Sequence, residues 1–201
     1  PSAILGFAAK KKRVVLIALR SFGFFQGLTM SSPVTLKFEP LTREGFAPYG
    51  DVIESEGRDS MPMNAGMAQR FHALADVDAI GEDGHGIISL IEAKLFEMPE
   101  SVTFVERHPQ GSQAFIPMDD VPFLVVVAPP TEQIDLSQMK AFVTNGKQGI
   151  NYHRGTWHHV LLTPFAAMRF ICVDRAGKGN NCDEFWFDEA EQPLLTPVDA
   201  C

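Results

Sequence analysis

Short apolar runs broken by Gly, Pro and Asp make up most of the chain after Val34. Runs rich in β-branched and aromatic residues, with turn residues between them, are typical of strands. Helical periodicity is scarce, and it predicts only short helices at Arg43–Ala47, after the cap Thr42, and around Asp135–Met139. The spacing predicts a mainly β sandwich or barrel rather than βαβ units. The expected strands are Thr35–Phe38, Ile87–Phe96, Val102–Glu106, Gln113–Ile116, Phe123–Ala128, Lys140–Thr144, His159–Leu162 and Met168–Val173.

The composition supports one domain with a substantial core. The chain has 201 residues, 45% of them hydrophobic, and its 16 Phe against two Tyr and two Trp supply bulky apolar filling for a β core. No repeat of the length typical of solenoids or propellers is visible. We therefore expect a single domain over residues 30–201.

Residues 1–29 differ in charge from the rest of the chain. They contain five basic residues and no acid, and the apolar run Val14–Leu19 follows four consecutive basic residues. Arg20 ends that run far short of the ~20 residues that span a bilayer. We expect an extension outside the domain, with a natural start at Met30, and keep a mitochondrial-type presequence as the alternative.

The remaining sequence is acidic. In the whole chain 25 acids outnumber 17 Lys and Arg, which gives a formal charge of -8 and argues against nucleic acid as a partner. A small anionic substrate would need a locally positive pocket, so single arginines matter. The three cysteines, Cys172, Cys182 and Cys201, have no paired spacing, which favours a reducing, cytoplasmic location over a secreted one. We expect no membrane partner.

Three of the six histidines fall in the segment Asn151 to His159. Gly155 permits a tight turn that leads into a strand, where side chains alternate between two faces. Only one of the adjacent residues His158 and His159 can therefore face a barrel interior, and we choose His158. His153, across the turn, is expected to converge on the same space.

A second polar group is formed by Glu106, His108 and Gln113. Period-two alternation puts Glu106 and His108 on one side of an extended run, and a buried Gln113 amide would need partners. The structural alternative is that Glu106 pairs with Arg107 or another surface cation and that Gln113 caps a turn. The sequence leaves these interpretations about even.

Together the two groups follow the order of the two cupin motifs. Glu106, His108 and Gln113 stand where the first motif has two His and a Glu, and His153, Gly155 and His158 stand in the second. The cupin likeness implies a double-stranded β-helix, a jelly-roll barrel. It also places Glu106, His108, Gln113 and His158 at the four metal-ligand positions.

Longer stretches of sequence point to one particular family. RHPQGSQAFIP, FVTNGKQGINYHRGTWHH and QRFHAL, with Asp174-Arg175 and the run 181–184, closely resemble the ureidoglycolate lyase family from near Leu36 to about Glu184. The resemblance implies a homodimer that splits (S)-ureidoglycolate into glyoxylate and urea during allantoin and purine degradation. Such an elimination needs a base for the hydroxyl proton and an acid for the ureido nitrogen.

The resemblance also implies roles for individual residues. His108, His153 and His158 would share the base and acid roles, and a bidentate guanidinium would hold the substrate carboxylate. Arg70 is the first choice for that guanidinium, with Arg107 and Arg175 as the other choices. The remaining substrate-binding candidates are Asn64 and Gln113, whose amides suit a ureido group, and Tyr152, which would form part of the wall.

The sequence leaves the metal and the exact function open. The ligand set Glu106, His108, Gln113 and His158 would hold a divalent ion, with nickel suggested by the family resemblance, or the same residues would form an acid–base site without metal. The competing functions are another small-acid cupin enzyme, such as a metal-dependent isomerase or dioxygenase, and a non-catalytic cupin that binds a ureide or sugar acid.

Overall fold

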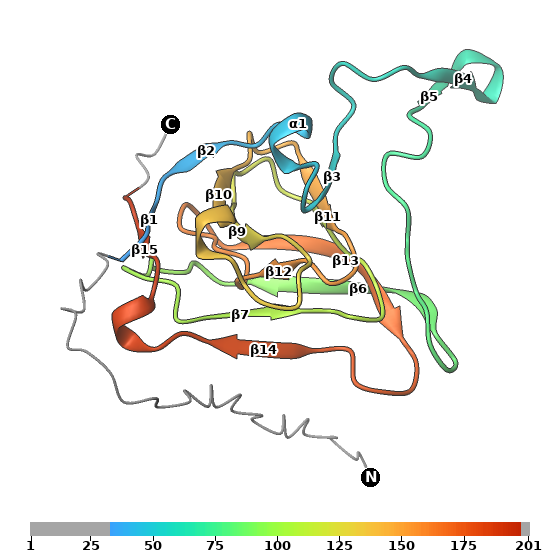
Figure 1. The fold of residues 1–201 in the computed structure, drawn as a ribbon. Helices are drawn as coiled ribbons and strands as arrows, with labels where there is room; N and C mark the ends of the chain where they lie inside the picture. Colours follow the sequence, from blue (N-terminus) through green and yellow to red (C-terminus); the bar gives the residue numbers. More distant parts are fainter. Residues whose placement is uncertain (1–32, 198–201) are drawn as a thin grey trace, which may run out of the picture. The chain divides into compact units, whose positions relative to one another are not determined.

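The computed structural model describes residues 33–197, so the extension expected at 1–29 and the start at Met30 lie outside the described residues. Two sheets form the body (Figure 1). Sheet I contains, in spatial order, β14 (Asp183–Trp186), β7 (Phe104–Arg107), β12 (Trp157–His158), β9 (Leu124–Ala128), β10 (Lys140–Val143) and β2 (Phe38–Pro40). Sheet II contains β3 (Gly50–Ile53), β11 (Gly149–Tyr152), β8 (Gln113–Pro117), β13 (Met168–Ala176) and β6 (His85–Ala93).

The two sheets face each other across an apolar core. Val125 and Phe142 of sheet I pack in one cluster with Phe115, Ile150 and Phe170 of sheet II. These strands alternate inward and outward side chains, so each sheet contributes every second residue to this inner core. The arrangement agrees with the mainly β, cupin-like fold expected from the sequence.

A second apolar cluster covers the other face of sheet I. Val105, Val126 and Trp157 pack there with Phe187 and Leu195 of the C-terminal segment. That segment ends in β15 (Leu194–Leu195), which pairs in parallel with β1 (Thr35–Leu36). The tail therefore wraps the body and buries apolar surface that sheet I would otherwise expose.

The helices are short. Thr42 caps α1 (Arg43–Phe46) by accepting a hydrogen bond from the Gly45 amide, and Phe46 is buried. Within the described residues, three 3₁₀ turns occur, at Asn64–Gly66, Leu136–Gln138 and Glu189–Glu191. No helix among residues 33–197 is long and apolar enough to cross a membrane.

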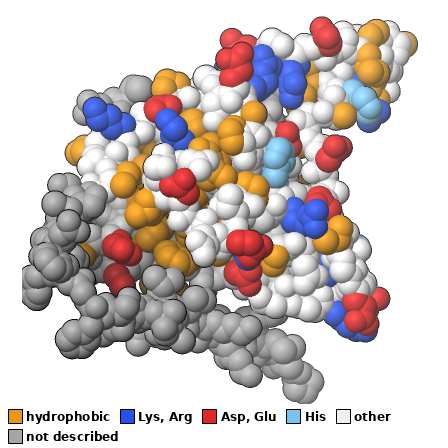
Figure 2. Space-filling model, viewed as in Figure 1, with side chains coloured by type: hydrophobic (Ala, Val, Ile, Leu, Met, Phe, Trp, Pro, Cys, Tyr) orange, Lys and Arg blue, Asp and Glu red, His pale blue; other side chains and the backbone are white. Residues whose placement is uncertain are grey.

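A long excursion leaves the body between β3 and β6. We call residues 54–80 the arm; its tip is a small hairpin of β4 (Met61–Met63) and β5 (Ala68–Arg70) that projects from the body (Figure 1). Hydrophobic side chains are visible at its end in Figure 2. They include Met61, Met63 and Met67, the last with 87% of its surface exposed.

One expected strand is wrong. The chain is in ladder pairing at β12, residues 157–158, and not over His159–Leu162. After His158 the chain leaves the ladder, and Leu162 rejoins Leu124 only through an isolated bridge. Strands β3, β11 and β14 were not expected, because their polar and Gly positions interrupt the apolar pattern.

Candidate active site

Two rows of polar residues face each other between the sheets. Strand pairing places Glu106 opposite His158 in sheet I and Gln113 opposite Tyr152 in sheet II. The rows meet, because the His158 and Tyr152 rings lie 4.3 Å apart, centroid to centroid, and His158 Nε2 is 3.2 Å from Gln113 Oε1. We call the following six residues the polar layer: Glu106, His108, Gln113, Tyr152, His158 and Asp174.

Backbone carbonyls set the protonation of both histidines in the layer. His108 Nδ1 lies 2.7 Å from the Asn181 carbonyl oxygen, and His158 Nδ1 lies 3.1 Å from that of Glu106. A carbonyl only accepts, so each Nδ1 carries a hydrogen, and in the neutral form of either ring Nε2 carries the lone pair. Burial, with the neighbouring His108 and His159, lowers the pKa of His158 well below 6.5, which keeps that ring neutral.

The layer holds most of the unsatisfied polar atoms of the described chain. Four buried side-chain atoms among residues 33–197 have no hydrogen-bond partner, and three of them are His108 Nε2, Tyr152 Oη and Asp174 Oδ1. The fourth is Arg58 Nε, in the arm. Buried polar groups are ordinarily paired, since an unpaired one costs about 1–3 kcal/mol. Three such atoms in one layer indicate a place where a ligand completes the hydrogen bonding.

Asp174 belongs to the layer, which the sequence did not predict. An acid next to an arginine suggests an ion pair, but the two side chains alternate on β13 and Arg175 donates instead to the carbonyls of Ile80 and Lys178. Burial raises the pKa of Asp174, against the opposing effects of His108 and of a hydrogen bond from Gln113. The sequence feature that could have revealed this is the alternation of side chains along a strand, which puts Asp174 on the same face as Phe170 and Cys172.

The layer can hold a metal ion. Ligand atoms of Glu106, His108 and His158 all lie within 4.8 Å of one another. An Nδ1–H that donates to a backbone carbonyl while Nε2 stays free is how metal-binding histidines are usually oriented. Gln113 donates its amide hydrogen to Asp174 and so turns Oε1 toward the His158 lone pair. Two ligand atoms that each lie about 2.1 Å from one metal ion are roughly 3 Å from each other. The 3.2 Å distance between His158 Nε2 and Gln113 Oε1 therefore also fits two ligands of one cation.

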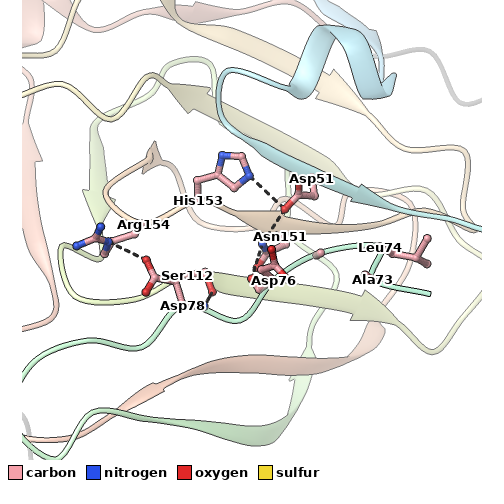
Figure 3. Close-up of a pocket in the computed structure, with 10 residues that line it drawn as sticks. Asp51, Ala73, Leu74, Asp76, Asp78, Ser112, Asn151, His153 and Arg154 are labelled. Atoms are coloured by element: carbon pink, nitrogen blue, oxygen red, sulfur yellow. Dashed lines mark hydrogen bonds and ion pairs between the residues drawn. The ribbon is translucent and has the colours of Figure 1, made fainter. Parts of the chain in front are cut away.

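His153 lies on the opposite face of sheet II from Tyr152. Its Nε2 is 3.1 Å from Asp51 Oδ2, and Asn151 donates to the same carboxylate oxygen. Arg154 pairs with Asp78 at 2.8 Å. Figure 3 shows these side chains around a separate hollow, which we call the outer hollow; it is lined by Asp51, Ala73–Asp76, Asp78, Ser112, Asn151, His153 and Arg154. The structure thus brings His108 and His158 together and leaves His153 outside.

The expected substrate-binding residues divide in the same way. Gln113 and Tyr152 are in the polar layer, whereas Asn64 and Arg70 are exposed at the tip of the arm. Arg107 pairs with Asp183 and Glu132 and lies over the Trp157 ring, on the face of sheet I away from the layer. Among residues 33–197, no arginine side chain forms a hydrogen bond or ion pair with a residue of the layer, which contains two carboxylic acids.

A two-sheet β fold with imidazoles and carboxylates between its sheets defines a cupin-like enzyme. A model of the ureidoglycolate lyase family matches residues 33–193. Proteins named ureidoglycolate lyase from Pseudomonas syringae pv. tomato and Pseudomonas paraeruginosa are 51% and 53% identical to the chain over 163 residues, which is 81% of this chain and 96% of each relative. A third, from Pseudomonas fluorescens strain Pf0-1, is 53% identical over 81% of the chain and 98% of its own length. The chain belongs to the ureidoglycolate lyase family.

Proposed function

We propose that this protein cleaves (S)-ureidoglycolate to glyoxylate and urea, a step in allantoin and purine degradation. The observation that carries the proposal is the polar layer with its three unpartnered buried atoms, in a chain of this family. The reaction breaks one C–N bond, removes a proton from the hydroxyl and adds one to the ureido nitrogen. It needs no attacking water, which suits a site buried between two sheets.

The layer needs positive charge to hold this substrate. Ureidoglycolate carries a carboxylate, and Glu106 and Asp174 already place acidic groups in the layer. We therefore propose a divalent cation held by Glu106, His108, Gln113 and His158, with nickel as the first candidate. When bound, such an ion supplies a counter-charge for the substrate carboxylate and lowers the pKa of the hydroxyl group.

The chain's own residues move the protons in this proposal. Glu106 accepts the hydroxyl proton on the carboxylate oxygen that does not hold the ion, since only one of its two oxygens is needed in the group with His108 and His158. Burial raises the pKa of Tyr152, so its unpartnered hydroxyl keeps its proton and donates a hydrogen bond to the departing nitrogen. That nitrogen receives the proton that Glu106 has accepted, which returns both residues to their starting state. His153 has no part in this scheme, since Asp51 holds it at the outer hollow.

A direct assay tests the activity. Protein is incubated with racemic ureidoglycolate, and glyoxylate and urea are measured above the spontaneous rate. Equal release of both products from one enantiomer supports the proposal. Binding without release would instead indicate a non-catalytic ureide-binding protein, and oxygen uptake or isomer exchange would indicate another small-acid cupin enzyme.

We also propose a cytoplasmic homodimer. Cys172 and Cys182 are free thiols, which supports a reducing compartment. Apolar side chains are exposed on the arm and on β6, where Ile88 is 76% and Leu90 59% exposed, and burial of these against a second copy would stabilise a dimer. Sedimentation equilibrium of the wild type and of Leu90→Glu tests this: a monomeric wild type would contradict it.

A further inference from the structure

Asp174 is positioned to meet a ligand rather than another protein group. Register pairs Cys172 with Phe115 and Val173 with Ala114, so the next pair along the ladder is Asp174 beside Gln113. The Gln113 amide donates one hydrogen bond to the carboxylate. Oδ1 of this carboxylate is buried and has no partner.

The neighbouring cation does not neutralise this carboxylate. Arg175 points to the other face of β13, where it donates to the Ile80 carbonyl at 2.6 Å and the Lys178 carbonyl at 2.9 Å. A buried carboxylate oxygen without a donor is costly, so its presence calls for a donor from outside the chain. A carboxylate accepts hydrogen bonds and repels other anions.

These two properties select one end of the substrate. Ureidoglycolate has a carboxylate at one end and, at the other, a ureido group with N–H donors on two nitrogens. The ureido N–H groups match an acceptor-only oxygen, whereas the carboxylate end would be repelled by it. The carboxylate end would then lie toward Glu106, His108 and His158, where the proposed cation supplies positive charge.

We propose that Asp174 accepts a hydrogen bond from the ureido N–H groups and thereby makes the site specific for ureido substrates. This inference rests on the proposed function for the identity of the substrate. It assigns Asp174 a contact with the substrate and Gln113 a supporting contact that holds the Asp174 carboxylate in place.

Two ligands separate this role from a structural one. N-carbamoylglycine keeps the carboxylate and the ureido group but lacks the hydroxyl, so it binds without being cleaved. Glycolate keeps the carboxylate and hydroxyl but has no ureido group. For Asp174→Asn we expect the Kd of N-carbamoylglycine to rise by about 10- to 100-fold, as for loss of a charge-assisted hydrogen bond, and the Kd of glycolate to change less than about twofold.

The experiment measures both Kd values by calorimetry, together with metal content and thermal unfolding. Asp183→Asn, a carboxylate on the opposite face of sheet I, is the matched control and should alter neither Kd. Asp174→Ser serves if the Asn variant does not fold. Equal weakening of both ligands, or loss of metal, would show that Asp174 only positions Gln113 and would overturn the inference, as would no change in either Kd.

The same data separate this inference from the proposed activity. Absence of urea release by the wild type would contradict the activity. Selective loss of N-carbamoylglycine binding in Asp174→Asn would still establish the ureido contact.

Discussion

The last residue of β11 and the residue that follows it lead to two very different regions. Tyr152 points between the sheets into the polar layer, and His153 points away from it into the outer hollow. In the outer hollow, His153, Asn151 and Arg154 all have carboxylate partners. In the polar layer three buried atoms have none. Two residues that are adjacent in sequence therefore need not belong to the same site. Buried polar atoms without a hydrogen-bond partner are the better guide to where a ligand binds.

The strongest test of this comparison removes one histidine from each region. We expect His158→Ala to lower kcat by about 10³-fold, because it removes a ligand nitrogen from the layer. His153→Ala should change kcat by less than about threefold. Steady-state release of glyoxylate measures both, and similar losses in the two variants would contradict the separation of the regions.

Removal of metal should affect only the polar layer. Protein purified without added ions should contain about one equivalent of divalent metal, and dialysis against a chelator should lower activity by about 100-fold, with recovery when the ion is returned. Elemental analysis of His108→Ala should show the metal lost, whereas His153→Ala should retain it. A content below a tenth of an equivalent in active wild-type protein would exclude the proposed cation.

Tyr152→Phe separates activity from stability. The Tyr152 hydroxyl is buried without a partner, so its removal should leave the free energy of unfolding unchanged or raise it by up to about 1 kcal/mol. Activity should fall by about tenfold through loss of the hydrogen bond to the departing nitrogen. Urea denaturation and the glyoxylate assay give the two values. A clear loss of stability would mean that the hydroxyl has a structural partner.

The smallest effect concerns pH. Burial lowers the pKa values of His158 and His159 below the unfolded value of 6.5, so the unfolded state binds more protons. Stability is therefore full above pH 6.5 and falls as the pH drops below it, by at most about 1.4 kcal/mol per pH unit for each group. Urea unfolding at pH 7.5 and 5.5 measures this. His159→Gln should reduce the dependence, and an unchanged dependence would exclude His159 as a cause.

The sequence predicted the fold class well because most strands carry continuous apolar runs. Strand β9, for example, is buried at all five positions and was expected almost to the residue. Strand β11 was missed, since Asn151 and Gly149 interrupt its pattern, although tertiary packing buries all four residues. Local pattern does not record burial that neighbouring strands impose.

The site was predicted in part for a similar reason. Alternation indicated one inward histidine, and His158 does contact Gln113, which is far away in sequence. If residues 152 and 153 had been read as a continuous strand, alternation would have put Tyr152 and His153 on opposite faces. A turn was expected at this place instead, and side chains do not alternate regularly through a turn. Asp174 was missed because an acid beside an arginine resembles an ion pair and because the expected strand ended at Val173, whereas β13 continues to Ala176.

The parallel pair of β1 and β15 brings the two ends of the described domain together, with Thr35 opposite Leu194. A short peptide linker could join these ends, and the chain could be opened instead at Gly66, at the exposed tip of the arm. Such a circular permutant would keep both sheets intact. It would offer new attachment points at the arm's tip for tethering the protein to a support.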